Sequence, residues 1–479
     1  MIFRFLKTRL SWIGLLLLVL VGSISLGGCG GGGSGGNGEG DLETLLSNLE
    51  NAGFRITEGD PVQIDLEDLF CRGLLPSGYG NNVTTPYITL RQDPVPGAAP
   101  TAFPWTYRLR QDEAMVLLGR TAPKSVYFSL QTFAALRWFE DKGYTGRMFA
   151  LFGDTINHLT INAQGEDTPY DSFFVMITTG NKRTEEKVRD ALSDAGYGNG
   201  TVNVETIPGE LVRFGLDESG DQFSFLYRIA LVENPEEERR YYETVGGMRL
   251  FRLTPEEELS PAPYPVKTLR PRGTGSNELH LLPSLKKLED ALLETYSGFQ
   301  AEKLPTAPYV AEGYNPILQD IDALGATNDT TYLLTPPFSL EEDDFVIAYG
   351  VQHAAAGKAL YNSVIAYGWT LLEDLPDDPR FEGLREMMGI AAIDSPEDFA
   401  GSARPFLPGD PQADLLYVVK IARSSGGQQA DLLIPPPSCR RLKLRELALA
   451  FRAYCEPATK TGPAYAELLF DRAILFRRR

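Results

Sequence analysis

Short apolar and β-branched runs, separated by glycine and proline, recur through most of this chain and constrain its fold more than any other feature. Residues 87–90, 114–118 and 125–130 are examples. Runs of this length and composition are typical of strands rather than helices. The 25 Phe and 21 Tyr among 479 residues can form a sizeable core, and this length suits two or three domains. The sequence therefore predicts a β-rich globular protein and excludes general disorder.

The second half of the chain contains runs that resemble those of the first. Residues 82–85 match 328–331, and 113–119 match 344–350, where an acid opens each run and a glycine closes it. Two interpretations stay open: an internal duplication that gives two sandwich-like β units with a cleft between them, or chance similarity between β segments. Between the matching runs, residues 171–254 alternate strand, helix, strand and strand, which predicts a ferredoxin-like α+β segment. The predicted fold class is thus α+β and β-rich.

Changes in composition divide the chain into six predicted parts. These are a signal peptide at 1–28, a Gly-rich tether at 29–40, a β-rich unit at 41–170, an α+β unit at 171–254, a Pro-rich linker and helix at 255–327, and a second β-rich unit with a C-terminal helix at 328–479. The C-terminal helix is expected because apolar residues between 442 and 451 have helical spacing.

The first 29 residues have the layout of a secretory signal. Arg4, Lys7 and Arg9 precede an apolar run over 12–24, and small residues then lead to Cys29. The apolar run is shorter than the roughly 20 residues that a membrane-spanning helix needs. This disfavours a plain transmembrane anchor and favours a signal that is cleaved.

The segment Leu26-Gly27-Gly28-Cys29 also resembles the lipobox of bacterial lipoproteins. The resemblance covers this segment alone. It implies diacylglycerol transfer to the Cys29 sulfur, cleavage before Cys29 and acylation of the new amino terminus. The Gly-rich residues that follow would act as a flexible tether. No Asp follows Cys29, which favours the outer membrane or cell surface if the host is Gram-negative. We therefore expect a lipid-anchored protein of the cell envelope that contacts the membrane through the lipid on Cys29.

The charge of the chain limits its partners. Without residues 1–28, which hold three of the 45 basic residues and no acid, 42 basic residues face 64 acidic ones, a net charge of −22. Phosphate contacts need clustered Lys and Arg, so nucleic acid is not an expected partner. An anionic bilayer repels such a chain, which fits a domain that stands off the membrane on a tether.

Two histidines are the candidates for catalysis or ligand binding. Asp154 and His158 are four residues apart, so on a helical turn the carboxylate could orient the imidazole as a general base. Nearby isoleucines suggest a strand instead, in which case Asp154 would be a turn residue and His158 a hydrogen-bonded one. His353 precedes a run of small residues, which is compatible with a ligand site or with a tight hairpin.

The remaining motifs exclude several kinds of site. Four cysteines without paired spacing and three histidines provide no metal site. Gly-x-Ser-x-Gly is absent, and Gly357-Lys358 lacks the rest of a phosphate-binding loop. We therefore predict no metal and no cofactor.

The cysteines predict one disulfide. With Cys29 lipidated, Cys71, Cys439 and Cys455 remain in an oxidising compartment. A helix between the last two would separate them by about 24 Å, well beyond the Cα distance of a disulfide. Cys71 is therefore expected to pair with Cys439 or with Cys455. Three unpaired, buried thiols are the alternative.

The sequence favours a ligand- or partner-binding module of the envelope over an enzyme. Phe103, Trp105 and Tyr107, together with Trp138 and Phe139, are candidate contact surfaces for a small molecule or a protein. The alternative is a hydrolase-like envelope enzyme that uses His158 or His353 with a nearby carboxylate, and a third interpretation is a structural protein. The stretches 153–158 and 344–368 are similar to an uncharacterised family of secreted proteins, a resemblance that implies no activity.

Overall fold

The computed structural model describes residues 40–479, apart from 76, 79, 165–167, 371–385 and 443. The described residues belong to one compact unit that begins at Gly38. The signal peptide, Cys29 and nearly all of the tether lie outside them. Within the described part, no helix is long and apolar enough to cross a membrane.

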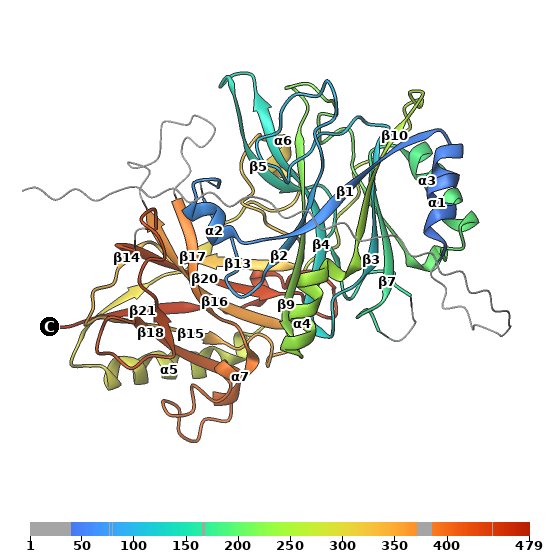
Figure 1. Ribbon diagram of the computed structural model, residues 1–479. Coiled ribbons are helices and arrows are strands. Elements are labelled where there is room, and N and C mark those ends of the chain that lie inside the picture. Colours follow the sequence, from blue (N-terminus) through green and yellow to red (C-terminus); the bar gives the residue numbers. More distant parts are fainter. Residues whose placement is uncertain (1–39, 76, 79, 165–167, 371–385, 443) are drawn as a thin grey trace, which may run out of the picture. The chain divides into compact units, whose positions relative to one another are not determined.

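The protein is an α+β structure in which strands predominate (Figure 1). We call residues 42–255 the first half and residues 282–477 the second half. The first half contains α1 (Leu42–Asn51), β1 (Phe54–Ile64), α2 (Leu66–Cys71), β2 (Tyr87–Arg91), β3 (Ala114–Arg120), β4 (Ser125–Phe139), β5 (Tyr144–Leu151), β6 (Ile156–Asn157), β7 (Phe173–Thr179), α3 (Lys182–Asp194), β8 (Val202–Thr206), β9 (Gln222–Val232), α4 (Pro235–Thr244) and β10 (Arg249–Pro255).

The second half begins with a longer helix and then follows a similar course. It contains α5 (Leu282–Thr295), β11 (Gln300–Leu304), β12 (Ala307–Pro308), α6 (Asn315–Leu318), β13 (Thr330–Leu334), β14 (Phe338–Ser339), β15 (Phe345–Val351), β16 (Tyr361–Thr370), β17 (Glu386–Ile393), α7 (Pro396–Phe399), β18 (Leu416–Arg423), β19 (Leu432–Ile434), β20 (Glu446–Tyr454) and β21 (Arg472–Arg477).

The two halves have the same strand order. In the first half, one sheet runs β5-β4-β9-β2-β1-β10-β3-β7-β8, because the long strand β1 pairs with β10 through its first residues and with β2 through its last. In the second half, β11 and β12 take the place of β1 and divide the order into β17-β16-β20-β13-β12 and β11-β21-β15-β18-β19. The last pair is parallel in each half, β7 with β8 and β18 with β19.

Each half buries one core between its two sections of sheet and a second core beneath helices. In the first half, the inner face of β3 and β7 packs against β2, β4 and β9, with Met115, Phe174, Phe128 and Tyr227 among the buried residues. The other face of β3 and β7 is covered by α1 and α3. Asp41 begins α1 by accepting a hydrogen bond from the Thr44 amide at 3.0 Å, which satisfies an otherwise free N–H.

The halves meet along a shared cluster of aromatic rings. Tyr361 stacks on Tyr454 with centroids 4.4 Å apart, and Tyr127 of the first half lies 5.3 Å from Tyr454. Beside them, the Tyr127 hydroxyl donates to Asp329 Oδ2 at 2.9 Å, and Asn157 Nδ2 donates to the same oxygen at 3.1 Å. This junction is therefore a packed interior in which aromatic and polar side chains interlock.

Two sequence expectations about the organisation differ from the structure. The predicted boundary at residue 170 falls inside one sheet, because β9 pairs with β2 and β4 while β7 pairs with β3. The predicted C-terminal helix is wrong, since β20 occupies Glu446–Tyr454 as a strand. Almost every residue of β20 is buried, and a continuous apolar run satisfies helical spacing as well as strand spacing.

Candidate functional site

A pocket lies on the face of the first-half sheet that points away from the main core. Along β9 the side chains alternate, so Phe223, Phe225 and Tyr227 enter the core while Ser224, Leu226 and Arg228 line the pocket. Tyr87 of β2, Leu136 of β4 and Phe149 of β5 extend the same face. The strand period therefore builds the floor of this pocket.

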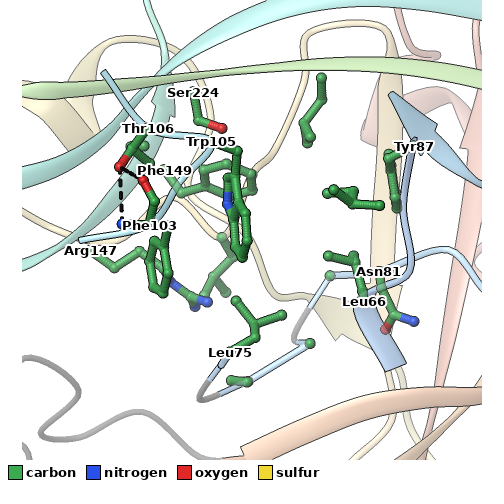
Figure 2. A pocket seen from close by; sticks show the side chains of 18 of the residues that line it. Leu66, Leu75, Asn81, Tyr87, Phe103, Trp105, Thr106, Arg147, Phe149 and Ser224 are labelled. Carbon is green, nitrogen blue, oxygen red and sulfur yellow. Dashed lines mark hydrogen bonds between the residues drawn. The ribbon is translucent and has the colours of Figure 1, made fainter. Parts of the chain in front are cut away.

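Two loops and a short helix wall the pocket. Phe103 and Trp105 stand on the loop before β3, with ring centroids 5.1 Å apart and planes within 5° of parallel. Figure 2 shows Trp105 near the middle, with Phe103 and Arg147 on one side and Leu66, Asn81 and Tyr87 on the other. Leu324 and Gly325 complete the wall from the second half. Residues far apart in the sequence thus line an open pocket with a cavity volume of about 120 Å³.

Hydrogen bonds hold the aromatic loop in place. Thr106 Oγ1 donates to the Phe103 carbonyl at 3.0 Å, and the Phe103 amide lies 3.3 Å from the same hydroxyl (Figure 2). Gln222 Oε1, at the start of β9, accepts from the Ala102 amide at 2.8 Å and lies 3.0 Å from Thr106 Oγ1. The stacked pair Phe103–Trp105 is therefore anchored to the strand that forms the floor.

Two arginines introduce positive charge into this apolar surface. Arg147 Nε donates to Asp322 Oδ2 at 2.6 Å, while its Nη2 is buried with no hydrogen-bond partner among the described residues. Arg228 is 7% exposed, and its Nη1 and Nη2 lie 3.5 Å from Thr327 Oγ1 and 3.3 Å from the Gly325 carbonyl. A site of this kind suits a small, mainly apolar molecule with a polar end.

The predicted pair Asp154 and His158 does not form. Asp154 accepts hydrogen bonds from the Arg270 amide at 3.0 Å and from Asn328 Nδ2 at 2.6 Å. His158 packs between Tyr127, Phe128 and Tyr170, and its Nδ1 has no partner in the described part of the chain. Burial lowers the pKa of His158 to about 4, so the ring is neutral at neutral pH. His158 therefore serves as a packing residue.

His353 does lie beside carboxylates, as the enzyme interpretation required. Its Nδ1 is 2.8 Å from Glu278 Oε1 and its Nε2 is 3.4 Å from Asp471 Oδ2. Burial alone would lower the pKa of His353, but the two carboxylates outweigh burial and raise it to about 10. A ring that keeps its proton at neutral pH and is 1% exposed cannot act as a general base. His353 instead ties Glu278, before α5, to Asp471 at the start of β21.

The predicted aromatic contact surface is divided. Phe103 and Trp105 line the pocket, whereas Tyr107 is part of the main core. Phe139 is buried against Tyr144 and, like Trp138, is not among the residues that line the pocket. Sequence reasoning missed Arg147 and Arg228. A single arginine inside the apolar run of β9 was the available signal for Arg228, because buried strands rarely carry a charge.

The structure contains the disulfide Cys71–Cys439, one of the two pairings that the sequence allowed. It joins the end of α2 to the segment before β20, with Cα atoms 5.7 Å apart. Cys455 is buried and has a free thiol. The helix expected between Cys439 and Cys455 does not form, since the strand β20 lies between them.

No protein-family model and no curated protein matches the chain. Among solved structures, a putative uncharacterized protein from Burkholderia cenocepacia is similar at 11% identity over 91% of this chain and 87% of that chain, with a TM-score of 0.36. The N-terminal CBM22-1-CBM22-2 tandem domain of Paenibacillus barcinonensis Xyn10C gives 7% identity over 92% and 94%, with a TM-score of 0.15. At these TM-scores neither similarity shows a shared fold or function.

Proposed function

We propose that this protein is a lipid-anchored component of the cell envelope that binds a small ligand in the pocket beside Trp105. The lipobox resemblance of residues 26–29 supports the anchor, and the pocket supports the binding. The folded part would stand off the membrane on the Gly-rich tether and present the pocket to its surroundings.

The open pocket above β9 is the observation that carries this proposal. Phe103 and Trp105 are stacked on each other, yet both remain partly exposed at a cavity lined by Leu66, Leu226 and Phe149. Burial of an aromatic ring is strongly favourable. Because this loop holds two rings only half-buried, a ligand that covers them would gain the free energy of burying the rest of their surface. A cavity of about 120 Å³ is close to the size that holds a single benzene-like ring.

No observation favours the enzyme alternative. Neither His158 nor His353 is among the residues that line the pocket, and both are buried elsewhere. The pocket lining contains no Asp, Glu or His among the described residues, and Asp322, which lies beside it, is ion-paired with Arg147.

Ligand-observed NMR would test the binding proposal. The full chain with Cys29→Ser, exported without its lipid, should transfer saturation to 2-phenylethanol, a neutral aryl probe. Trp105→Ala should weaken that signal because it removes one face of the pocket. Trp138→Ala is the matched control, since Trp138 is also half-buried but does not line the pocket. Equal signals from Trp105→Ala and wild type, or none from wild type, would refute binding at this pocket.

Membrane fractionation would test the anchor. The wild-type chain should sediment with membranes, and Cys29→Ser should be released into the soluble fraction because acylation needs the cysteine thiol. A Cys29→Ser chain that still sediments would mean that the anchor lies elsewhere.

We also propose that the two sandwich-like halves arose by internal duplication. The shared strand order supports it, as do matching contacts within the halves. The Asn82 amide donates to the Tyr87 hydroxyl at 2.9 Å, and the Thr327 amide donates to the Tyr332 hydroxyl at 3.2 Å. The sheet face in the second half that matches the pocket floor carries a packed cluster of Ile365, Tyr367, Met387, Ala448 and Ala450. On this proposal, ligand binding belongs to the first half.

A further inference from the structure

Among the described residues, no carboxylate balances the positive charge of Arg228. Its side chain is buried in the pocket wall, and no carboxylate oxygen of the described residues lies within 4 Å of its guanidinium. Arg147, the other arginine of the pocket, is balanced by Asp322 at 2.6 Å. As far as the described residues go, the pocket therefore has one uncompensated positive charge.

The hydrogen bonds of Arg228 are also incomplete. A guanidinium has five N–H donors, but Arg228 makes two contacts, at 3.3 and 3.5 Å, and both are to neutral oxygens. Arg452, at the matching position, also lacks a carboxylate partner within 4 Å among the described residues, and its Nε has no hydrogen-bond partner there, but its other donors are better used. It pairs with Tyr332 as Arg228 pairs with Tyr87, and it donates to four neutral oxygens at 2.5 to 3.2 Å. Arg228 differs because it borders the cavity.

A buried and unpaired guanidinium is costly, and an anion beside it offsets that cost. Arginine binds a carboxylate through short, charge-assisted hydrogen bonds that are often bidentate. Arg147 Nη2, which is buried and has no partner among the described residues, offers a further donor in the same pocket. One unbalanced charge suits one negative charge on the ligand. The rest of the lining is mainly apolar or aromatic, and its polar side chains, Ser77, Asn81, Thr106 and Ser224, are neutral.

We infer that the pocket binds a small monocarboxylate with an aryl or short apolar body. Its carboxylate would meet Arg228, and its body would lie against the stacked pair Phe103–Trp105. The inference rests on the proposed function, because it names the class of ligand for the same pocket. The cavity volume suits a body of about one ring.

Phenylacetate and 2-phenylethanol form the test pair, since they share a ring and spacer and differ in the carboxylate. We expect the wild-type chain carrying Cys29→Ser to bind phenylacetate about tenfold or more tightly than 2-phenylethanol, in titrations at low salt and neutral pH. Arg228→Met should remove this preference and keep the affinity for 2-phenylethanol. Arg249→Met is the matched control, because Arg249 is exposed and lies outside the pocket.

The outcomes separate the inference from the proposed function. Equal affinities of the wild type for the two probes, or a preference that survives in Arg228→Met, would overturn the inference while ligand binding stands. Binding of neither probe would overturn both. The wild-type ratio decides the ligand class even if Arg228→Met does not fold, and Arg228→Lys then provides a second variant, which should retain part of the preference because it keeps the charge but loses the bidentate geometry.

Discussion

Arg228 and Arg452 reach across the junction of the two halves in opposite directions. Arg228 Nη2 lies 3.3 Å from the Gly325 carbonyl, and Arg452 Nη2 lies 2.9 Å from the Gly80 carbonyl. Both glycines have positive φ, +71° for Gly325 and +89° for Gly80. Gly325 precedes Tyr332, and Gly80 precedes Tyr87, by the same number of residues. In each half this tyrosine is the strand partner of the arginine, Tyr332 of Arg452 and Tyr87 of Arg228. The junction is thus held by a reciprocal exchange between matching loops.

The two arginines should nevertheless contribute unequally to stability. Arg452→Met removes four hydrogen bonds and leaves buried acceptors behind, so we expect a loss of about 2–4 kcal/mol in the free energy of unfolding. Both arginines lack a carboxylate partner among the described residues, so the difference lies in the hydrogen bonds. Arg228→Met removes only two long contacts, and its loss should be no more than about 1 kcal/mol. Urea unfolding of both variants checks this, and equal losses would contradict it.

The disulfide Cys71–Cys439 should stabilise the fold strongly. It closes a loop with a sequence separation of 368 residues, so Cys71→Ala should lower the free energy of unfolding by about 3–5 kcal/mol. Dithiothreitol should destabilise the wild type by a similar amount and leave Cys71→Ala unchanged. Peptide mapping without reduction provides the direct check, and a Cys439–Cys455 link or only free thiols would disprove the pairing.

The ion pairs of His353 should make stability decline at alkaline pH. The pKa of His353 is raised from 6.5 to about 10 in the folded protein, so the folded state binds an extra proton between these values. The resulting stabilisation is complete below about pH 6.5 and is lost as pH rises to about 10. The stability difference between wild type and His353→Gln should therefore shrink by roughly 3–5 kcal/mol over this window.

Chemical unfolding at a series of pH values measures this difference. His280→Gln is the matched control, because His280 is exposed, and its difference from wild type should stay flat above pH 7. A His353→Gln curve that runs parallel to the wild-type curve would show that the imidazole is not held in its charged form.

Glu205 should produce a second pH dependence at acid to neutral pH. Its carboxyl group is 6% exposed, and burial raises its pKa from 4.5 to about 7, although it accepts hydrogen bonds from the Thr132 amide and Thr178 Oγ1. The folded state therefore holds a proton that the unfolded state has released. Relative to Glu205→Gln, the wild type should lose about 3 kcal/mol as pH rises from about 4.5 to 7.

The control for Glu205 is an exposed glutamate. Glu294→Gln should give a stability curve parallel to that of the wild type, because Glu294 is on the surface of α5. If Glu205→Gln also runs parallel to the wild type, the carboxyl group is ionised throughout this range and the buried-acid interpretation fails.

Several of the longer strands were predictable from short-range pattern. The order strand, helix, strand and strand predicted within 171–254 corresponds to β7, α3, β8 and β9. The same method failed for β20, because a run buried on both faces has no polar side to reveal its period. Local spacing also suggested that Asp154 and His158 interact. In the structure Asp154 instead accepts a hydrogen bond from the Arg270 amide, and His158 packs against Tyr127.

By itself, the sequence determined the β-rich class, the positions of several long strands and the three cysteines from which one disulfide could form. Tertiary structure alone decided which distant residues meet. Gly325 reaches the pocket beside Arg228, and Glu278 reaches His353, through contacts that no local pattern encodes. The physical reason is that periodicity records which face of an element is buried, while burial does not specify the partner. The packing partner of each face depends on how the sheets pack and on which buried charges are paired with an opposite charge.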